Sequence, residues 1–236
     1  MDQPGHPAGY DALPGGESRT PWERRQELGL VQGYFQTWKS ILFKPDEFWS
    51  GVSPTGTLWD ALSFGWVTVA LGLLISLPIS LLQSTGQQAQ LDQVMAQAQG
   101  QIPAEMERVV RMLLGAGASA AFHVGSAVLY PLFFFIGAGI LHLFCLLVGA
   151  SRNGFNATAR VYGYANAPAL LSGLPCINAL AGIYVLVLEA WGIGKVQQTT
   201  YGRAAAAVLM PLVLLCCCAI PAVIFGVVAL VGAAAQ

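Results

Sequence analysis

The amino-acid sequence predicts an all-α polytopic membrane protein with five transmembrane helices, preceded by amphipathic helices at the membrane surface. Hydrophobic residues make up 55% of the 236-residue chain and charged residues only 10%, whereas about a quarter of a soluble domain is charged. The mean hydropathy is +0.59. The apolar residues gather in blocks long enough to cross a bilayer, which takes about 20 helical residues. One membrane domain therefore accounts for most of the chain.

Composition also excludes several functional classes. The net charge of −1 excludes the basic surface of a nucleic-acid-binding protein. The five cysteines form no CxxC pair, so neither a disulfide framework nor a metal site is predicted. Cys216, Cys217 and Cys218 point about 100° apart on a helix and cannot converge on one ion. No catalytic or phosphate-binding motif is present, so we expect a protein that is not an enzyme and holds no cofactor.

The first 50 residues divide into a tail and an amphipathic region. Residues 1–21 are rich in proline and glycine and are predicted to be disordered. In residues 22–50, apolar side chains recur at alternating spacings of three and four, which places them in one stripe on a helix. The stripe consists of Leu28, Val31, Phe35, Trp38 and Leu42.

Pro45 ends this helix and suits the first turn of the next one, which carries Phe48 and Trp49. Because tryptophans flank the region, we favour helices that lie on the bilayer. Their membrane-interface residues would be Phe35, Trp38, Leu42, Phe48 and Trp49. The alternative is a stripe that packs on the protein's own core.

Residues 51–236 form the membrane domain, and its apolar blocks predict five spans. The spans run over about residues 58–82, 115–149, 157–174, 177–193 and 204–231. The second block is far longer than one crossing requires. It is either one long helix kinked near Pro131 or two separate spans.

The distribution of lysine and arginine decides between these readings, because such residues near helix ends favour the cytoplasm. With a single second span, nine of them lie on the N-terminal side of the membrane and only Arg108 and Arg111 lie opposite. Splitting the block would move four of the nine across. We therefore predict five spans, with the N-terminus in the cytoplasm and the C-terminus outside. A re-entrant hairpin formed by the third and fourth spans would leave the same charge count.

The stretch ARVYGYANAPALL, residues 159–171, places two phenols, an amide and a proline inside an apolar block. Polar or irregular backbone in a bilayer is tolerated only against protein or a water-filled cavity. Gly163 and Ala167 make a smooth face that lets another helix approach. We therefore predict a central helix whose polar groups are satisfied by its neighbours. The alternative is a polar cavity that conducts or binds a solute.

Two ionisable residues, His142 and Glu189, lie at similar depth near the cytoplasmic ends of their helices. Intramembrane ionisable groups usually have partners, so one hypothesis pairs these two with each other. The favoured alternative is that Glu189 reaches the interface and pairs with Lys195 or Arg160. The candidate cluster of intramembrane polar residues comprises Tyr162, Tyr164, Asn166, Pro168, His142 and Glu189.

The segment VYGYANAP resembles the "GY…P" signature at the start of the third membrane helix in the Yip-domain (Ypt/Rab-interacting protein) family. The layout of a cytoplasmic N-terminal region, five membrane helices and a short outer tail is also similar. Bacterial members have an aromatic-rich segment before the first helix and a YxxAxxP pattern, which corresponds here to Tyr162, Ala165 and Pro168. The resemblance covers about residues 30–230.

This resemblance implies a non-catalytic scaffold or adaptor in a bacterial inner membrane. Its partners would be the lipid bilayer and other membrane proteins or further copies of the chain. The DLYGPL motif of eukaryotic members is absent, with Trp59, Asp60 and Ala61 at best a remnant. The resemblance therefore gives no basis for binding of Rab-type GTPases. The alternative function is transport of a small solute, ion or lipid through a polar cavity between helices 2–4.

Overall fold

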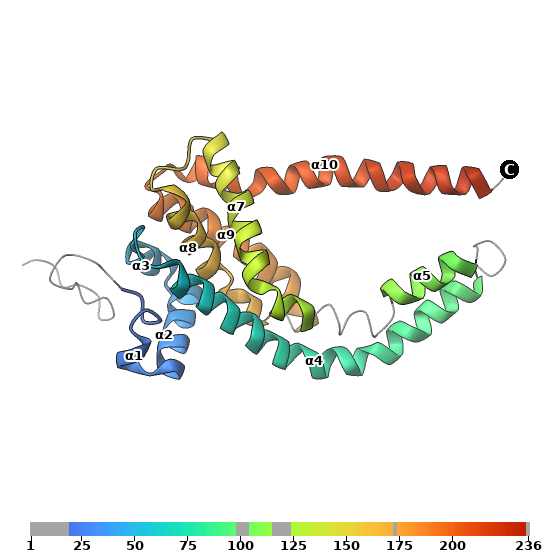
Figure 1. Cartoon of the computed structure of the whole chain (residues 1–236), viewed down its shortest axis with the longest axis horizontal. Helices are drawn as coiled ribbons and strands as arrows, with labels where there is room; N and C mark the ends of the chain where they lie inside the picture. The colour runs from blue at the N-terminus through green and yellow to red at the C-terminus, as the bar shows by residue number, and fades with distance from the viewer. Residues whose placement is uncertain (1–18, 98–103, 115–123, 172–173, 235–236) are drawn as a thin grey trace, which may run out of the picture.

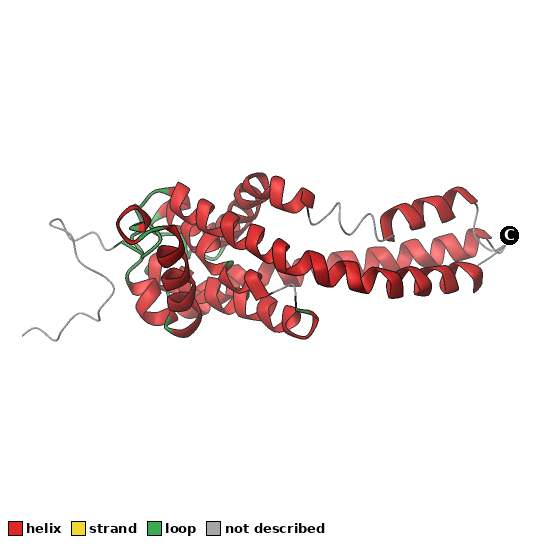
Figure 2. Ribbon diagram, turned by 90° about the horizontal axis from the view of Figure 1, so that it is seen from below, coloured by secondary structure: helices red, strands yellow, loops and turns green. Residues whose placement is uncertain are grey.

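The helices gather at one end of the molecule, and two long helices extend away from it (Figure 1). The computed structural model describes residues 19–97, 104–114, 124–171 and 174–234, and the regular structure in these ranges is helical (Figure 2). The gathered end contains α1 (Arg25–Leu28), α2 (Leu30–Phe43), α3 (Pro45–Ser50), α7 (Tyr130–Leu147), α8 (Gly154–Ala165), the 3-10 helix η1 (Ala167–Leu171) and α9 (Pro175–Val196). The extending helices are α4 (Leu58–Gln97), which carries α5 (Ala104–Leu114) beside its far part, and α10 (Tyr201–Ala234).

Proline marks the first turn of α3, α7 and α9, where its missing backbone N–H costs no helical hydrogen bond. Pro131 lies in the first turn of α7, and a bend at Leu129 separates α7 from the helical residues 124–128. This break in the helix lies close to the expected kink near Pro131. Pro78 does lie inside a helix, α4. Loss of one hydrogen bond there accounts for the bend of α4 in Figure 1.

Four helices in the described ranges are long and apolar enough to cross a membrane. They are Leu58–Ser80, Tyr130–Leu147, Ile177–Val196 and Tyr201–Cys218. They agree in position with the first, second, fourth and fifth predicted spans. The second candidate is shorter than the predicted span of residues 115–149. Residues 115–123 lie outside the described residues, and a bend at Leu129 separates the helical residues 124–128 from α7.

The predicted third span, residues 157–174, is not a long apolar helix. Its residues belong mainly to α8, which has only 12 residues, and to the 3-10 helix η1. Twelve residues rise about 18 Å, well short of the roughly 30 Å of hydrocarbon in a bilayer. The structure therefore shows an all-helical protein with four candidate spans, and five spanning helices are not shown.

Helix α8 lies at the centre of the bundle and packs against α4, α7 and α9. Gly163 makes this packing possible, since an added Cβ would lie 2.6 Å from the backbone oxygen of Ala61 in α4. Ala167, at the start of η1, is also fully buried. The smooth face expected at Gly163 and Ala167 is thus used for close helix approach.

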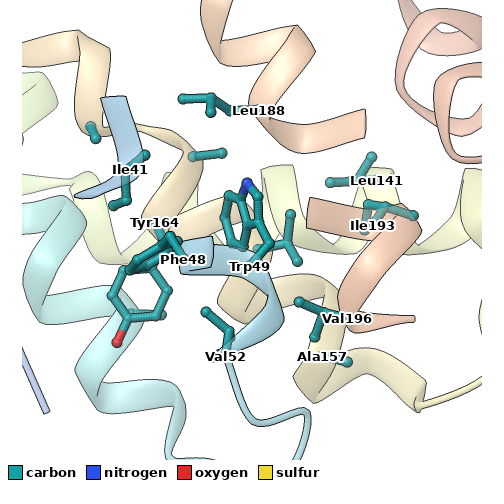
Figure 3. Close-up of a cluster of buried hydrophobic side chains, with 14 of the residues drawn as sticks. Ile41, Phe48, Trp49, Val52, Leu141, Ala157, Tyr164, Leu188, Ile193 and Val196 are labelled. Atoms are coloured by element: carbon teal, nitrogen blue, oxygen red, sulfur yellow. The ribbon is translucent and has the colours of Figure 1, made fainter. Parts of the chain in front are cut away.

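The apolar core is built around Trp49 of α3 (Figure 3). Trp49 is 1% exposed and Phe48 is fully buried. Gly192 of α9 leaves room for the indole ring, because an added Cβ there would lie 3.1 Å from it. The placement of Phe48 and Trp49 at the membrane interface is therefore corrected, since neither side chain reaches the protein surface.

The boundary of the N-terminal tail also differs from the prediction. Residues 1–18 of the expected disordered tail lie outside the described residues. Thr20, however, is fully buried and Pro21 is buried beside it. Residues 20 and 21, which were expected to belong to the tail, are thus part of the packed structure, and Thr20 already contacts Tyr164.

Candidate functional site

The N-terminal segment opens with a turn just before α1, TPWE at residues 20–23, which has the reciprocal hydrogen bonds of a capping box. The Glu23 backbone N–H donates to the Thr20 hydroxyl, and the Thr20 backbone N–H donates to Glu23 Oε2, each at 3.4 Å. Pro21 begins the turn of residues 21–24, which leads into α1 at Arg25. The capping box fixes the orientation of the Glu23 carboxylate and leaves its Oε1 atom for other partners.

That oxygen meets Arg160 of α8, a cation with no exposed surface. Arg160 Nη2 lies 2.5 Å from Glu23 Oε1, and Arg160 Nη1 donates to the backbone carbonyl of Thr57 at 2.8 Å. The Tyr164 hydroxyl, one turn further along α8, donates to the same Glu23 oxygen at 2.9 Å. Thr20 Oγ1 lies 3.2 Å from the Tyr164 hydroxyl. We call Thr20, Glu23, Arg160 and Tyr164 the Arg160 cluster.

The Arg160 cluster is tightly packed, and the charge of Arg160 is balanced by that of Glu23. A side chain at position 56 would collide with the Arg160 guanidinium, so Gly56 is required beside it. In the described part of the chain, Arg160 Nε has no hydrogen-bond partner. A buried charge is tolerated when its counter-charge is close, and removing one partner strands the other. The cluster therefore exists only while the N-terminal segment is docked.

A second set of polar contacts ties α1 and α2 to the start of α4. Arg25 Nη1 lies 2.6 Å from Asp60 Oδ1, and the Arg25 guanidinium lies 5.0 Å from the centroid of the Trp22 ring. The Trp22 indole N–H donates to the Ser63 hydroxyl at 3.0 Å. The Trp22 backbone N–H donates to Thr37 Oγ1 at 2.7 Å. These bonds hold residues 20–37 against the first turns of α4.

The buried face of α2 differs by one position from the predicted apolar stripe. Tyr34, Thr37 and Ile41 are all buried, at the spacing of one helical face. The Tyr34 hydroxyl donates to Thr68 Oγ1 of α4 at 3.1 Å. Burial raises the pKa of Tyr34, so it remains a neutral hydrogen-bond donor. The face of α2 that packs against the bundle is therefore this one, whereas the alternative expected the predicted stripe to do so.

The predicted stripe itself lies along the edge between the buried and exposed faces of α2. Phe35 is 53% exposed. Trp38 is half-buried and its indole N–H donates to the Ala167 carbonyl at 3.0 Å. Leu42 is half-buried as well, and its carbonyl accepts a hydrogen bond from the Tyr184 hydroxyl at 2.7 Å. Among these three residues, contact with lipid stays a prediction, and Phe35 is the side chain best placed to make it.

The polar stretch of α8 and η1 is packed among protein groups. Tyr162 is half-buried, with its ring centroid 5.8 Å from that of Phe134. Tyr164 belongs to the Arg160 cluster, and the Asn166 amide donates to the Tyr162 carbonyl at 2.8 Å. Pro168 is buried within η1. Among these four residues, Tyr162 and Tyr164 contact other helices, the Asn166 amide bonds to the backbone of its own segment, and Pro168 is buried.

The structure does not bring His142 and Glu189 into contact. His142 Nδ1 lies 2.9 Å from Thr158 Oγ1, and the Gln197 amide donates to the same hydroxyl at 2.8 Å. Glu189 is 7% exposed. Within the described ranges it takes part in no ion pair or hydrogen bond, so His142 is not its partner.

The two cations considered as alternative partners of Glu189 are also engaged elsewhere. Lys195 Nζ lies 2.8 Å from Asp46 Oδ1 of α3, and Arg160 is paired with Glu23. Glu189 therefore stands as a nearly buried carboxyl group on α9. Among the described residues, no group of three metal-ligating side chains comes together.

A family model identifies the domain: the Yip1 domain matches residues 39–224, which is most of the chain. The chain belongs to the Yip1 domain family. This family consists of non-catalytic membrane trafficking proteins, in agreement with the expectation that the chain is not an enzyme. No curated protein and no solved structure matches the chain.

The Arg160 cluster crosses the boundary of the Yip1 domain match. Arg160 and Tyr164 lie inside the matched region, whereas Thr20 and Glu23 precede it. The cluster thus joins the central helix of the domain to a segment outside the match. The sequence analysis did not single out Glu23, and it considered Arg160 only as a charge that sets the topology and as a possible partner of Glu189. The T-x-x-E spacing at residues 20–23 was the available signal that Thr20 and Glu23 bond to each other just before a helix.

Gln197 is a second important residue of the Yip1 domain that sequence reasoning missed. It is fully buried at the end of α9, and its Oε1 accepts the backbone N–H groups of Arg152 and Asn153 at 2.9 and 2.6 Å. Its Nε2 donates to the Gly154 carbonyl and the Thr158 hydroxyl, both at 2.8 Å. All the hydrogen-bonding positions of the amide are filled. The amide therefore fastens the start of α8 to the end of α9.

Proposed function

We propose that this Yip1 domain protein is a non-catalytic membrane scaffold whose N-terminal segment, residues 20–50, presents a surface of fixed shape to partner proteins. The observation that carries the proposal is the Arg160 cluster, which ties the segment to the central helix of the bundle. A docked surface loses less conformational entropy on binding than a flexible one does. The segment is thus suited to recognition of another protein.

The exposed part of α2 divides into a polar side and an apolar side. Gln32, Gln36 and Lys39 are exposed opposite the buried face. Val31 and Phe35 lie between this polar side and the buried face of α2, and they are 71% and 53% exposed. An amphipathic helix at a membrane surface has this arrangement. We infer that lipid covers Val31 and Phe35 and that the polar side faces the cytoplasm.

The course of the chain through α8 and η1 supports a third crossing of the membrane, and so five in total, although this segment is not a long apolar helix. α8 starts beside the end of α9, where Asn153 donates to the Val196 carbonyl at 2.7 Å. The 12 residues of α8 and five of η1 together rise about 28 Å, compared with about 33 Å for the 22 residues of α9. The two segments therefore match in length, and the protein around α8 replaces lipid contact.

The distribution of positive charge favours a cytoplasmic N-terminus and an outer C-terminus. From the resemblance to bacterial members we infer a location in a bacterial inner membrane. Its partners would be other membrane proteins or further copies of the same chain. Nothing in the sequence gives a basis for GTPase binding.

Photo-cross-linking in native membranes tests the scaffold proposal. A photoreactive amino acid replaces Gln36 on the polar side, Phe35 on the apolar side or, as a lipid-facing control, Leu132 of α7, which is 56% exposed. We expect discrete protein adducts from position 36, and lipid adducts from positions 35 and 132. Lipid adducts alone from position 36 would contradict the proposal.

Transport is the second candidate function, and Glu189 is the observation that favours it. A nearly buried carboxyl with no ion pair in the described ranges is an intramembrane ionisable group of the kind that marks ion or proton pathways. Purified protein in liposomes would then carry a proton or cation flux that Glu189→Gln abolishes. If wild-type liposomes are as tight as empty ones, the transport candidate is eliminated.

A further inference from the structure

An apolar groove runs between α9 and α10 on the outside of the bundle. It has a volume of about 580 Å³, and its walls include Val187 and Ala190 of α9 and Ala205 of α10. Both walls belong to candidate membrane spans. In a bilayer the groove therefore opens to hydrocarbon, and whatever fills it must be apolar along its length.

One end of the groove carries groups of a different chemistry. Trp191 and Tyr201 line the groove at the turn between the two helices. Gly194 lets the Tyr201 ring lie close, since an added Cβ would be 2.8 Å from two ring carbons. Amphipathic aromatic side chains of this kind are typical of the headgroup level of a bilayer.

The same end holds an exposed ion pair. The Trp191 indole N–H donates to Asp46 Oδ1 at 3.3 Å, and Lys195 Nζ lies 2.8 Å from the same oxygen. The hydrogen bond from Lys195 lowers the pKa of Asp46, which keeps the carboxylate charged at neutral pH. The second carboxylate oxygen, Oδ2, has no hydrogen bond within the described ranges, and the Asp46 side chain is 60% exposed. The mouth of the groove thus offers one positive and one negative group side by side.

We propose that the α9–α10 groove is a binding site for one phospholipid with a primary-amine headgroup, of the phosphatidylethanolamine type. An acyl chain lies along the apolar walls, the lipid phosphate faces Lys195 and the lipid ammonium donates to Asp46. A headgroup that carries both charges complements the ion pair at the mouth. A quaternary ammonium has no N–H to donate to the carboxylate, so phosphatidylcholine fits the mouth less well.

Native mass spectrometry of the full-length protein tests this site, using delipidated protein and added phosphatidylethanolamine, phosphatidylcholine or phosphatidylglycerol. We expect one phosphatidylethanolamine to be retained about tenfold better than phosphatidylcholine. This is the ratio of affinities that one additional charge-assisted hydrogen bond gives. Asp46→Asn should remove this preference. Lys195→Gln should weaken retention of all three lipids, since each has a phosphate.

Groove-filling variants separate a specific site from general lipid coating. Ala190→Trp and Ala205→Trp place a bulky ring in the groove and should abolish lipid retention. Leu212→Trp, on an exposed part of α10 outside the groove, is the matched control and should retain lipid. Thermal melting of each variant shows whether it is folded. Equal lipid retention in all three variants, or no discrimination between headgroups by the wild type, would overturn the proposal. So would a lipid-free dimer that the groove variants dissociate, because it would show that a second copy fills the groove.

Discussion

Arg160 is a buried cation whose counter-charge comes from a residue far away in the sequence, Glu23. Its other contacts are the Thr57 carbonyl and the ring of Tyr164, whose centroid lies 5.9 Å from the guanidinium carbon. Desolvation of a charge costs several kcal/mol, which only close counter-charge and hydrogen bonds offset. The stability of the central helix therefore depends on the docked N-terminal segment.

Breaking this ion pair should be costly, and removing both charges should be less so. Arg160→Met strands the Glu23 carboxylate, and we expect a loss of about 3–5 kcal/mol in the free energy of unfolding. The double variant Arg160→Met, Glu23→Leu should recover part of that loss. Thermal unfolding in detergent measures each variant.

The matched control for this measurement is Lys44→Met, which removes an exposed pair with Glu47 at 3.1 Å. Exposed pairs contribute under about 1 kcal/mol, so the control should melt close to the wild type. Equal melting of the Arg160 and Lys44 variants would mean that the Arg160 cluster contributes nothing to stability.

At the scale of helices, α8 depends on close approach to α4 through Gly163. Gly163→Ala places a Cβ against the Ala61 backbone, which neither helix can move away from cheaply. We expect a loss of about 1–3 kcal/mol from overpacking. Gly139→Ala in α7 is the control, because no atom lies within 4 Å of the added Cβ and alanine favours the helix. If the two variants have the same melting temperature, α4 and α8 do not pack as described.

Helix periodicity identified α2 but not its buried face. The predicted stripe counts only apolar residues and therefore passes over Thr37 and Tyr34. These two are buried because their hydroxyls bond to Trp22 and Thr68, partners that a local pattern cannot reveal. Phe48 and Trp49 were placed at the interface for a similar reason, since aromatic residues suit a membrane surface and a core equally well.

The four candidate spans could be predicted from composition, because a helix that faces lipid needs a long, uninterrupted run of apolar residues. The third predicted span is different: α8 is enclosed by other helices and can carry arginine, asparagine and tyrosine. From its residues a central helix satisfied by neighbours could be predicted. The contact between Arg160 and Glu23, separated by 137 positions, could not, since no spacing rule connects them.

At the scale of the whole molecule, four candidate spans and the α8–η1 segment predict a defined topology. Cysteine introduced at Gln97, the end of α4, should react with a membrane-impermeant reagent from outside. Cysteine introduced at Gln198, which is exposed after α9, should react only from the cytoplasmic side. Labelling of both sites from one side would contradict the proposed five crossings.

The central claim is that the N-terminal segment is an integral part of the Yip1 domain bundle, held by the Arg160 cluster. Hydrogen exchange of the full-length protein in lipid nanodiscs tests it most directly. We predict that the backbone amides of α2 are protected as strongly as those of α9 in the wild type. In Arg160→Met, exchange over residues 20–43 should rise by about tenfold or more, the effect of losing at least 1.4 kcal/mol, while α9 stays protected. Rapid exchange of α2 in the wild type, unchanged by the substitution, would show a separate surface helix and contradict the account.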